Sequence, residues 1–149
     1  MSDSVLIVGG GIAGITAALN AADYGRHVYL IDDTPSIGGV MARLDKTFPT
    51  NDCSICIEAP KMYEVNTHPN IEILTLTEVR KVTPFDGGFQ VRLIKKAKFV
   101  DEEKCNGCGK CVEACPVSVP DEIDGKIGGT RKLISIPFPQ SVPNVNYLD

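Results

Sequence analysis

The sequence predicts an α/β fold in which a strand–helix–strand unit is followed by a short cysteine-rich segment. An apolar, strand-forming run near the start ends directly in a glycine-rich turn. A helix-forming stretch then leads to a second apolar run, an order typical of the βαβ units of parallel sheets. Four closely spaced cysteines in the last third of the chain mark the second part. The 149 residues therefore divide into two regions with different chemistry.

The first strand is expected over Val5–Val8, a continuous run of apolar residues. The alanine-rich stretch 15–22 predicts a helix, and Gly25 is expected to close it as a C-cap because glycine adopts positive φ without strain. A second buried strand is predicted over His27–Ile31 and ends at Asp32-Asp33. This order, completed within about thirty residues, is typical of a Rossmann-type unit.

The remaining elements are predicted by weaker patterns. Four are expected before the cysteine-rich segment: one or two helical turns over 40–44, a short helix over 61–65, a third strand over 71–76, and a hairpin of 78–83 with 90–94. Pro60 is placed at the first turn of the short helix, where its missing N–H costs no hydrogen bond. The Pro- and Gly-rich stretch 121–149 is expected to be linker-like, without a closing strand or helix.

Three glycines, Gly9, Gly11 and Gly14, have the G-x-G-x-x-G spacing between the first strand and the helix. In this motif the first glycine permits a tight turn, the second lets the backbone approach a pyrophosphate, and the third lets helix and strand pack closely. The phosphate charge then faces the helix N-terminus. Asp32 ends the next strand, where a carboxylate accepts hydrogen bonds from ribose hydroxyls. The context predicts a dinucleotide site rather than a merely tight turn.

Four cysteines, Cys105, Cys108, Cys111 and Cys115, have the spacing C-x2-C-x2-C-x3-C and are followed by proline. This spacing is typical of 4Fe-4S ligation. The glycine at position 107 keeps the loop tight and leaves amides free to bond the sulfurs. A zinc site usually has two separated pairs of ligands, so the run predicts an iron–sulfur cluster.

A second pair of cysteines, Cys53 and Cys56, forms a C-x-x-C motif. Two functional interpretations remain open, a thiol pair that exchanges electrons with a flavin and a ligand to a nearby cluster. Two buried thiols at a helix start are the structural alternative. The fourth ligand of the cluster is equally open, because the last cysteine of such a run can bind a second cluster. The candidates for this fourth ligand are Cys115, either Cys53 or Cys56, and a partner protein.

Composition restricts the class of function. The chain has 43% hydrophobic residues, and 15 basic against 19 acidic residues give a net charge of -4. This acidic balance provides no electrostatic basis for binding nucleic acid or an anionic membrane, and no apolar run reaches the roughly 18 residues of a membrane span. The N-terminal residues lack the pattern of a secretory signal, so we expect a cytoplasmic protein. Its grouped cysteines favour metal or redox chemistry over structural disulfides.

Four strings together resemble the family of A-type subunits of heterodisulfide reductase: Gly9–Gly14, Ile37-Gly38-Gly39, 46–56 and 136–140. The corresponding subunit of quinone-interacting membrane-bound oxidoreductases is a close cousin. The resemblance implies a thioredoxin-reductase-like FAD domain with an inserted ferredoxin domain. The composition shifts at Asp101 and again after Val119, so we expect an incomplete FAD-binding Rossmann-type domain over 1–100, a ferredoxin-type 4Fe-4S segment over 101–120, and a Pro/Gly-rich extension over 121–149.

The resemblance also implies roles for individual residues. The FAD pyrophosphate and ribose are expected at Gly9, Gly11, Gly14 and Asp32, with Gly38 and Gly39 as a second approach to that cofactor. The metal ligands are expected to be Cys105, Cys108, Cys111 and Cys115. Cys53 matches a family cysteine near the flavin region. The C-x-x-C motif itself makes Cys53 and Cys56 the candidate catalytic residues, as a redox pair or as a cluster ligand.

Family members continue into a second cysteine run and a pyridine-nucleotide-like domain, so we expect an N-terminal fragment. Its expected partners are the other subunits of a heterodisulfide-reductase-like or quinone-interacting complex, together with the C-terminal half of its own subunit. The expected function is electron transfer, with FAD exchanging electrons with the cluster, because a flavin operates at one-electron and two-electron levels. A ferredoxin-like carrier or assembly fragment without flavin is one alternative. A flavin-dependent disulfide reductase that uses Cys53 and Cys56 is the other.

Overall fold

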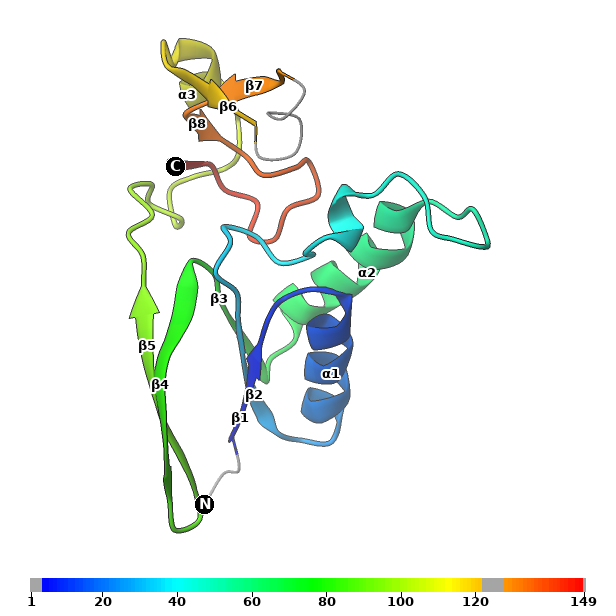
Figure 1. The fold of residues 1–149 in the computed structure, drawn as a ribbon, viewed down its shortest axis with the longest axis vertical. Helices are drawn as coiled ribbons and strands as arrows, with labels where there is room; N and C mark the ends of the chain where they lie inside the picture. Colours follow the sequence, from blue (N-terminus) through cyan, green and yellow to red (C-terminus); the bar gives the residue numbers. More distant parts are fainter. Residues whose placement is uncertain (1–3, 122–127, 149) are drawn as a thin grey trace. The chain divides into compact units, whose positions relative to one another are not determined.

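The computed structural model describes residues 4–121 and 128–148, and the chain divides into two compact units, Met1–Ala97 and Lys98–Asp149. Figure 1 shows the elements of both units. The first unit contains β1 (Ser4–Val8), α1 (Ile12–Asp23), β2 (His27–Ile31), the short 3-10 helix η1 (Met41–Arg43), α2 (Ser54–Thr67), β3 (Ile71–Leu74), β4 (Thr77–Phe85) and β5 (Gly88–Lys95). The second contains α3 (Lys110–Ala114), β6 (Ser118–Pro120), β7 (Thr130–Lys132), β8 (Ile134–Ser135) and β9 (Tyr147–Leu148).

A parallel sheet of order β1-β2-β3 forms the centre of the first unit. The central strand β2 is the most buried, with Val28 and Leu30 fully inaccessible. Helix α1 packs on β1 and β2, and α2 packs on α1 and β3 (Figure 1). Their apolar faces close the core, which is completed by Ile15, Ala18, Leu19 and Ala22 of α1 and by Met62 and Val65 of α2. The predicted βαβ unit is confirmed.

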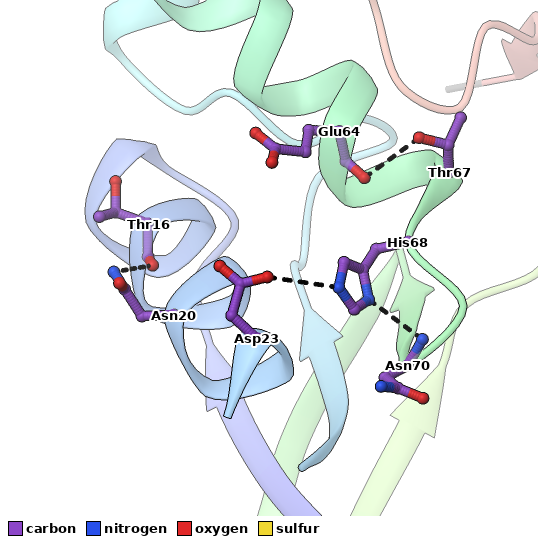
Figure 2. A network of polar contacts seen from close by, with 7 residues as sticks. All are labelled: Thr16, Asn20, Asp23, Glu64, Thr67, His68 and Asn70. Carbon is purple, nitrogen blue, oxygen red and sulfur yellow. Dashed lines mark hydrogen bonds and ion pairs between the residues drawn. The ribbon is translucent and has the colours of Figure 1, made fainter. Parts of the chain in front are cut away.

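Helix α1 ends one residue earlier than the predicted cap, because Tyr24 is its C-cap and Gly25 follows with a φ of 78°. The end of α2 is fastened beside it (Figure 2). His68, the C-cap of α2, lies with Nε2 3.7 Å from Asp23 Oδ1, and its Nδ1 accepts the backbone N–H of Asn70 at 3.1 Å. Since Nδ1 is an acceptor, the Nε2 of a neutral ring carries the hydrogen that faces Asp23. The contact joins the C-terminal ends of the two helices.

The predicted short helix over 61–65 is wrong at its start, because α2 begins at Ser54. Pro60 therefore lies in the helix interior and not in its first turn. A proline there removes one i to i−4 hydrogen bond and costs about 3 kcal/mol, which is why the pattern favoured a later start. The N-cap is Cys53, whose Sγ accepts the N–H of Cys56 at 3.3 Å.

The hairpin is confirmed as the antiparallel pair β4–β5, with an irregularity between Val79 and Lys81 and a turn in which Gly87 has a φ of 92°. The single turn of η1 agrees with the helical turns expected over 40–44. Strand β3 is two residues shorter than predicted, because Leu76 has a φ of 53° and leaves the strand conformation.

The second unit consists of α3 and two short antiparallel pairs, β6–β7 and β8–β9. The expectation of a linker-like stretch over 121–149 is wrong for the described residues, since three strands lie in it and β9 closes the segment. These strands have two or three residues each, too few for an alternating pattern to be visible in the sequence. Positions 122–127 lie outside the described residues.

No helix in the described parts of the chain is long and apolar enough to span a membrane.

Candidate functional site

The glycine-rich turn between β1 and α1 is held by the strand beside it, because the Gly9 N–H donates to Ile31 O at 2.8 Å. Gly9 has a φ of 100°, which favours glycine. A Cβ on Gly14 would lie 1.9 Å from Gly9 O, so only glycine lets α1 start this close to the turn. At Gly11, by contrast, a Cβ would meet no protein atom within 4 Å. The second glycine of the motif therefore faces open space.

The start of α1 suits an anionic group. Its N-cap is Gly11, which provides no side-chain cap for the helix. The amides of the first turn lack intrahelical partners and carry the positive end of the helix dipole. Open amides next to a glycine whose Cβ position is free are the features by which such turns bind pyrophosphate. The residues present here fit the phosphates of a dinucleotide.

Asp32 is buried and joins the end of β2 to the glycine turn. Its Oδ2 accepts the Gly10 N–H at 2.6 Å, and its Oδ1 accepts the backbone N–H and hydroxyl of Thr34. A carboxylate has about four acceptor positions, so about one remains for a ribose hydroxyl. Asp33 is exposed beside it. The carboxylate thus orders the turn and keeps limited capacity for a ligand.

The second glycine pair lies directly against the first motif. The Gly38 N–H donates to Gly10 O at 2.7 Å, and Gly38 forms a parallel bridge with Gly11. Gly39 has a φ of 58°, and a Cβ there would be 3.1 Å from Gly11 Cα. The structure therefore brings the two predicted glycine sites together at one edge of the sheet.

A cavity of about 420 Å³ opens at this edge, beside Gly9, Asp32 and Asp33. Its far wall consists of Thr77, Glu78 and Val79, which sequence reasoning missed. No local motif marks these three residues. They reach the site because the Thr77 N–H donates to Asp32 O at 2.8 Å. Only pairing between distant segments could have revealed them.

An ion pair lies next to this wall of the cavity. Lys96 Nζ is 2.5 Å from Glu78 Oε1. The hydrogen bond and positive charge of Lys96 lower the pKa of the Glu78 carboxyl, and the carboxylate raises the pKa of Lys96 in turn. Both side chains are largely exposed, so this pair contributes little to stability.

Cys53 and Cys56 are joined in a disulfide, with their Cα atoms 5.2 Å apart. Cys53 is half-buried and Cys56 is exposed, so the alternative of two buried thiols is wrong. The pair occupies the first turn of α2, where helix amides stabilise a thiolate after reduction. In the disulfide form neither sulfur is available to ligate a metal.

Glu58 is fully buried on α2, and neither carboxylate oxygen has a hydrogen-bond partner among the residues that the structure describes. Burial raises the pKa of this carboxyl to about 7. Ser54 lies one turn earlier and is fully buried, and within the described part of the chain its hydroxyl has no hydrogen-bond partner either. Sequence reasoning missed this pair, because an isolated glutamate on a helix is usually solvated.

The four-cysteine run forms an open loop that leads into α3. Gly107 and Gly109 have φ values of 68° and 74°, which allow the sharp bends between the cysteines. Cys105 and Cys115 are half-buried, whereas Cys108 and Cys111 are exposed. All four thiols are free.

The two half-buried sulfurs accept hydrogen bonds from amides. Backbone N–H groups of Gly107 and Asn146, and then the Asn146 side chain, lower the pKa of the Cys105 thiol. Backbone N–H groups, first that of Ile134, lower the pKa of the Cys115 thiol. Such N–H···S bonds are a main way in which proteins stabilise and tune cluster sulfurs. This donor set fits an iron–sulfur cluster.

Within the described residues, no three His, Cys, Asp or Glu side chains are arranged around one metal ion. A mononuclear site such as zinc requires that convergence. A cubane does not, because each cysteine binds a different iron atom. The expected 4Fe-4S ligand set is therefore compatible with this loop.

Two sequence families match the chain. Residues 4–52 match the FAD-dependent oxidoreductases, and residues 98–121 match the 4Fe-4S binding domain. FAD and a 4Fe-4S cluster are thus confirmed as the two expected cofactors. The matches fall on the glycine turns of the first unit and on the cysteine run of the second.

Curated relatives match the whole chain. It is 56% identical to an A-type iron–sulfur subunit of CoB–CoM heterodisulfide reductase from Methanopyrus kandleri, over 100% of this chain and 22% of that protein. It is 54% identical to the corresponding iron–sulfur subunit of Methanocaldococcus jannaschii, over 98% of this chain and 22% of that protein. The chain therefore spans about a fifth of the length of these relatives.

A solved structure agrees with the expected fold. Thioredoxin reductase of T. acidophilum has a TM-score of 0.53 and 26% identity, over 60% of this chain and 30% of that one. The prediction of a thioredoxin-reductase-like α/β unit followed by a ferredoxin-type segment is confirmed.

Proposed function

Over its whole length this chain is related to the A-type subunits of heterodisulfide reductase, and from that premise we propose that it transfers electrons between FAD and a 4Fe-4S cluster. The flavin part of the proposal rests on one observation: the two glycine turns, Asp32 and a cavity lie together at one edge of the sheet. When bound, FAD supplies exchange between two-electron and one-electron donors. Both units of the chain then take part in one redox function.

In this proposal the FAD pyrophosphate lies at Gly11 and the open amides of α1. Asp32 and the cavity bounded by Thr77–Val79 hold the adenosine side. Gly38 and Gly39 border the same turn and keep side chains away from the cofactor. The protein's part is to bind and orient the flavin against a surface without bulky groups.

The cluster is assigned to Cys105, Cys108, Cys111 and Cys115, with amides directed at the first and last of these sulfurs. We extend the cluster unit from the expected 101–120 to 98–149, because residues beyond 130 contact the cysteine loop. The FAD-binding unit then covers 1–97 in place of the expected 1–100.

The relatives are named as subunits of heterodisulfide reductases. We assign this chain's partners to the other subunits of such a complex and to the polypeptide that makes up the rest of the longer relatives. A quinone-interacting complex stays a prediction. We place the protein in the cytoplasm, where a reducing environment keeps clustered thiols available for a cluster.

The test is to purify the chain without oxygen and to quantify flavin, iron and sulfide. One FAD with about four iron atoms per chain supports the proposal. A Cys108→Ser variant should lose iron but keep flavin, and a Gly11→Val variant should lose flavin but keep iron. Iron without flavin in the unaltered chain would favour a ferredoxin-like carrier and overturn the flavin part.

A second candidate function rests on the disulfide between Cys53 and Cys56. Its S–S bond would accept two electrons and two protons, with a reduced flavin as electron donor, and would yield two thiols. Cys53 at the start of α2 is placed where a helix stabilises the thiolate form.

Thiol alkylation with peptide mapping tests this candidate. After photoreduction of the flavin-loaded chain, both cysteines should become labelled. A Cys53→Ser variant is the control, because its Cys56 should be labelled before reduction. If the pair stays unlabelled once the flavin is fully reduced, the disulfide is not an acceptor for this flavin.

A further inference from the structure

Asn146 is a buried residue that reaches back to the start of the cysteine run. Its side chain is only 3% exposed and it directly precedes β9. Its Nδ2 donates to Cys105 Sγ at 3.8 Å, across 41 positions of sequence. A buried side-chain amide needs partners, and this one is directed at a sulfur. The contact lies wholly within the second unit.

Asn146 provides two donors to the same atom. Besides the side chain, its backbone N–H is directed at Cys105 Sγ, together with the backbone N–H of Gly107. At the other half-buried sulfur, that of Cys115, backbone groups of Ile134, Val117 and Leu133 lower the pKa of the thiol, and the thiol itself donates to Val117 O at 3.5 Å. The side-chain amide on Cys105 is thus a donor that a point substitution can remove while the backbone donors remain.

We propose that Asn146 is a positioning residue for the iron–sulfur cluster, which it anchors at Cys105 and whose reduced state it stabilises. This inference rests on the cluster assignment of the proposed function. A reduced cluster carries one more negative charge, part of which lies on the thiolate sulfurs. N–H···S bonds favour that charge, so they raise the reduction potential. Because Asn146 is buried, water does not readily replace a lost donor.

A purely structural role makes a different prediction. If Asn146 only fastened the end of the second unit, its loss would lower stability but leave the cluster potential unchanged. Asn144 is a matched control on the same segment. It is exposed, and its Nδ2 donates to Pro139 O at 3.0 Å rather than to a sulfur. Its Oδ1 lies near Gly107, so it tests general disturbance of the loop.

The experiment is an EPR-monitored redox titration of the anaerobically purified chain and its variants. Asn146→Leu removes the side-chain donor, and Asn146→Asp replaces it with an oxygen of nearly the same shape. Both should shift reduction toward more negative potential, with Asn146→Asp the larger because it adds negative charge. For Asn146→Leu we expect up to about a tenfold change in the reduction equilibrium, or about 59 mV for one electron. Asn144→Leu should match the unaltered chain.

A second measurement starts from the unaltered chain, so its first result does not depend on a variant folding. Pulsed EPR of the reduced unaltered chain, labelled with ¹⁵N-asparagine, should show coupling to an asparagine nitrogen. Retention of that coupling in Asn144→Leu and its weakening in Asn146→Leu would identify the residue. No asparagine coupling, or equal potentials for the two leucine variants at equal iron content, would overturn the inference. Absence of a cluster from the unaltered chain would instead contradict the cluster assignment itself.

Discussion

The carboxylate of Asp32 accepts the backbone N–H of Gly10 at 2.6 Å, which fastens the end of β2 to the turn that follows β1. A Cβ on Gly10 would lie 3.0 Å from that same oxygen. The acid at the end of the second strand is therefore part of the turn itself. If Asp32 also contacts a ribose, it does so in addition to holding this turn in place.

Replacing Asp32 should damage both fold and binding. In Asp32→Ala the bonds from Gly10 and Thr34 are lost, and we expect about 2 to 4 kcal/mol lower stability and little bound FAD. Chemical denaturation of the flavin-free chain and flavin quantification measure the two effects. Asp33→Asn is the control and should keep both, because Asp33 is exposed. If the control loses flavin and Asp32→Ala does not, the ribose contact belongs to Asp33.

Substitutions at two glycines of the G-x-G-x-x-G motif should affect different properties, one the stability of the protein and the other its affinity for FAD. Gly14→Ala forces a Cβ to 1.9 Å from Gly9 O, so α1 must shift, at a cost of about 1 to 3 kcal/mol. Gly11→Ala meets no protein atom and should leave the thermal midpoint nearly unchanged. Its methyl group would occupy the approach to the pyrophosphate, so FAD affinity should fall. Equal flavin affinity in Gly11→Ala and the unaltered chain would place the phosphates elsewhere.

Glu58 should make stability depend on pH. Its pKa is raised from 4.5 to about 7 by burial, so the folded state keeps a proton that the unfolded chain releases. Stability is therefore fully present below about pH 4.5 and is lost as pH rises to about 7, by about 3 kcal/mol. Denaturation of Glu58→Gln should lack this decline. Glu64→Gln, exposed on the same helix, should retain it, and a decline common to both variants would assign it to another group.

Pro60 should lower the stability of the helix that carries Cys53 and Cys56. Pro60→Ala restores a backbone N–H for the carbonyl of Cys56. The gain is partly offset by greater freedom of the unfolded chain, so we expect about 1 to 2 kcal/mol of net stabilisation. Denaturant titration measures it. Destabilisation would mean that the ring's packing outweighs the missing bond.

Local patterns allowed prediction of several elements. Some elements form because of residues that are close together in the sequence, so a local pattern predicts them. These are the strands β1 and β2, the helix α1 and the turn at Asp86-Gly87. The start of α2 was misplaced because Pro60 is a strong local signal and a cysteine N-cap is a weak one. The short pairs β6–β7 and β8–β9 depend on partners ten or more residues away.

The two cofactor chemistries can be predicted from the sequence, since glycine spacing and cysteine spacing act over a few residues of backbone. Tertiary structure alone decided which distant groups complete each site. Thr77–Val79 border the cavity through the pairing of Thr77 with Asp32, and Asn146 reaches Cys105 across 41 positions. It also decided that Glu58 is buried without a hydrogen-bond partner in the described ranges 4–121 and 128–148. Such contacts depend on how elements pack, and no residue-by-residue pattern encodes them.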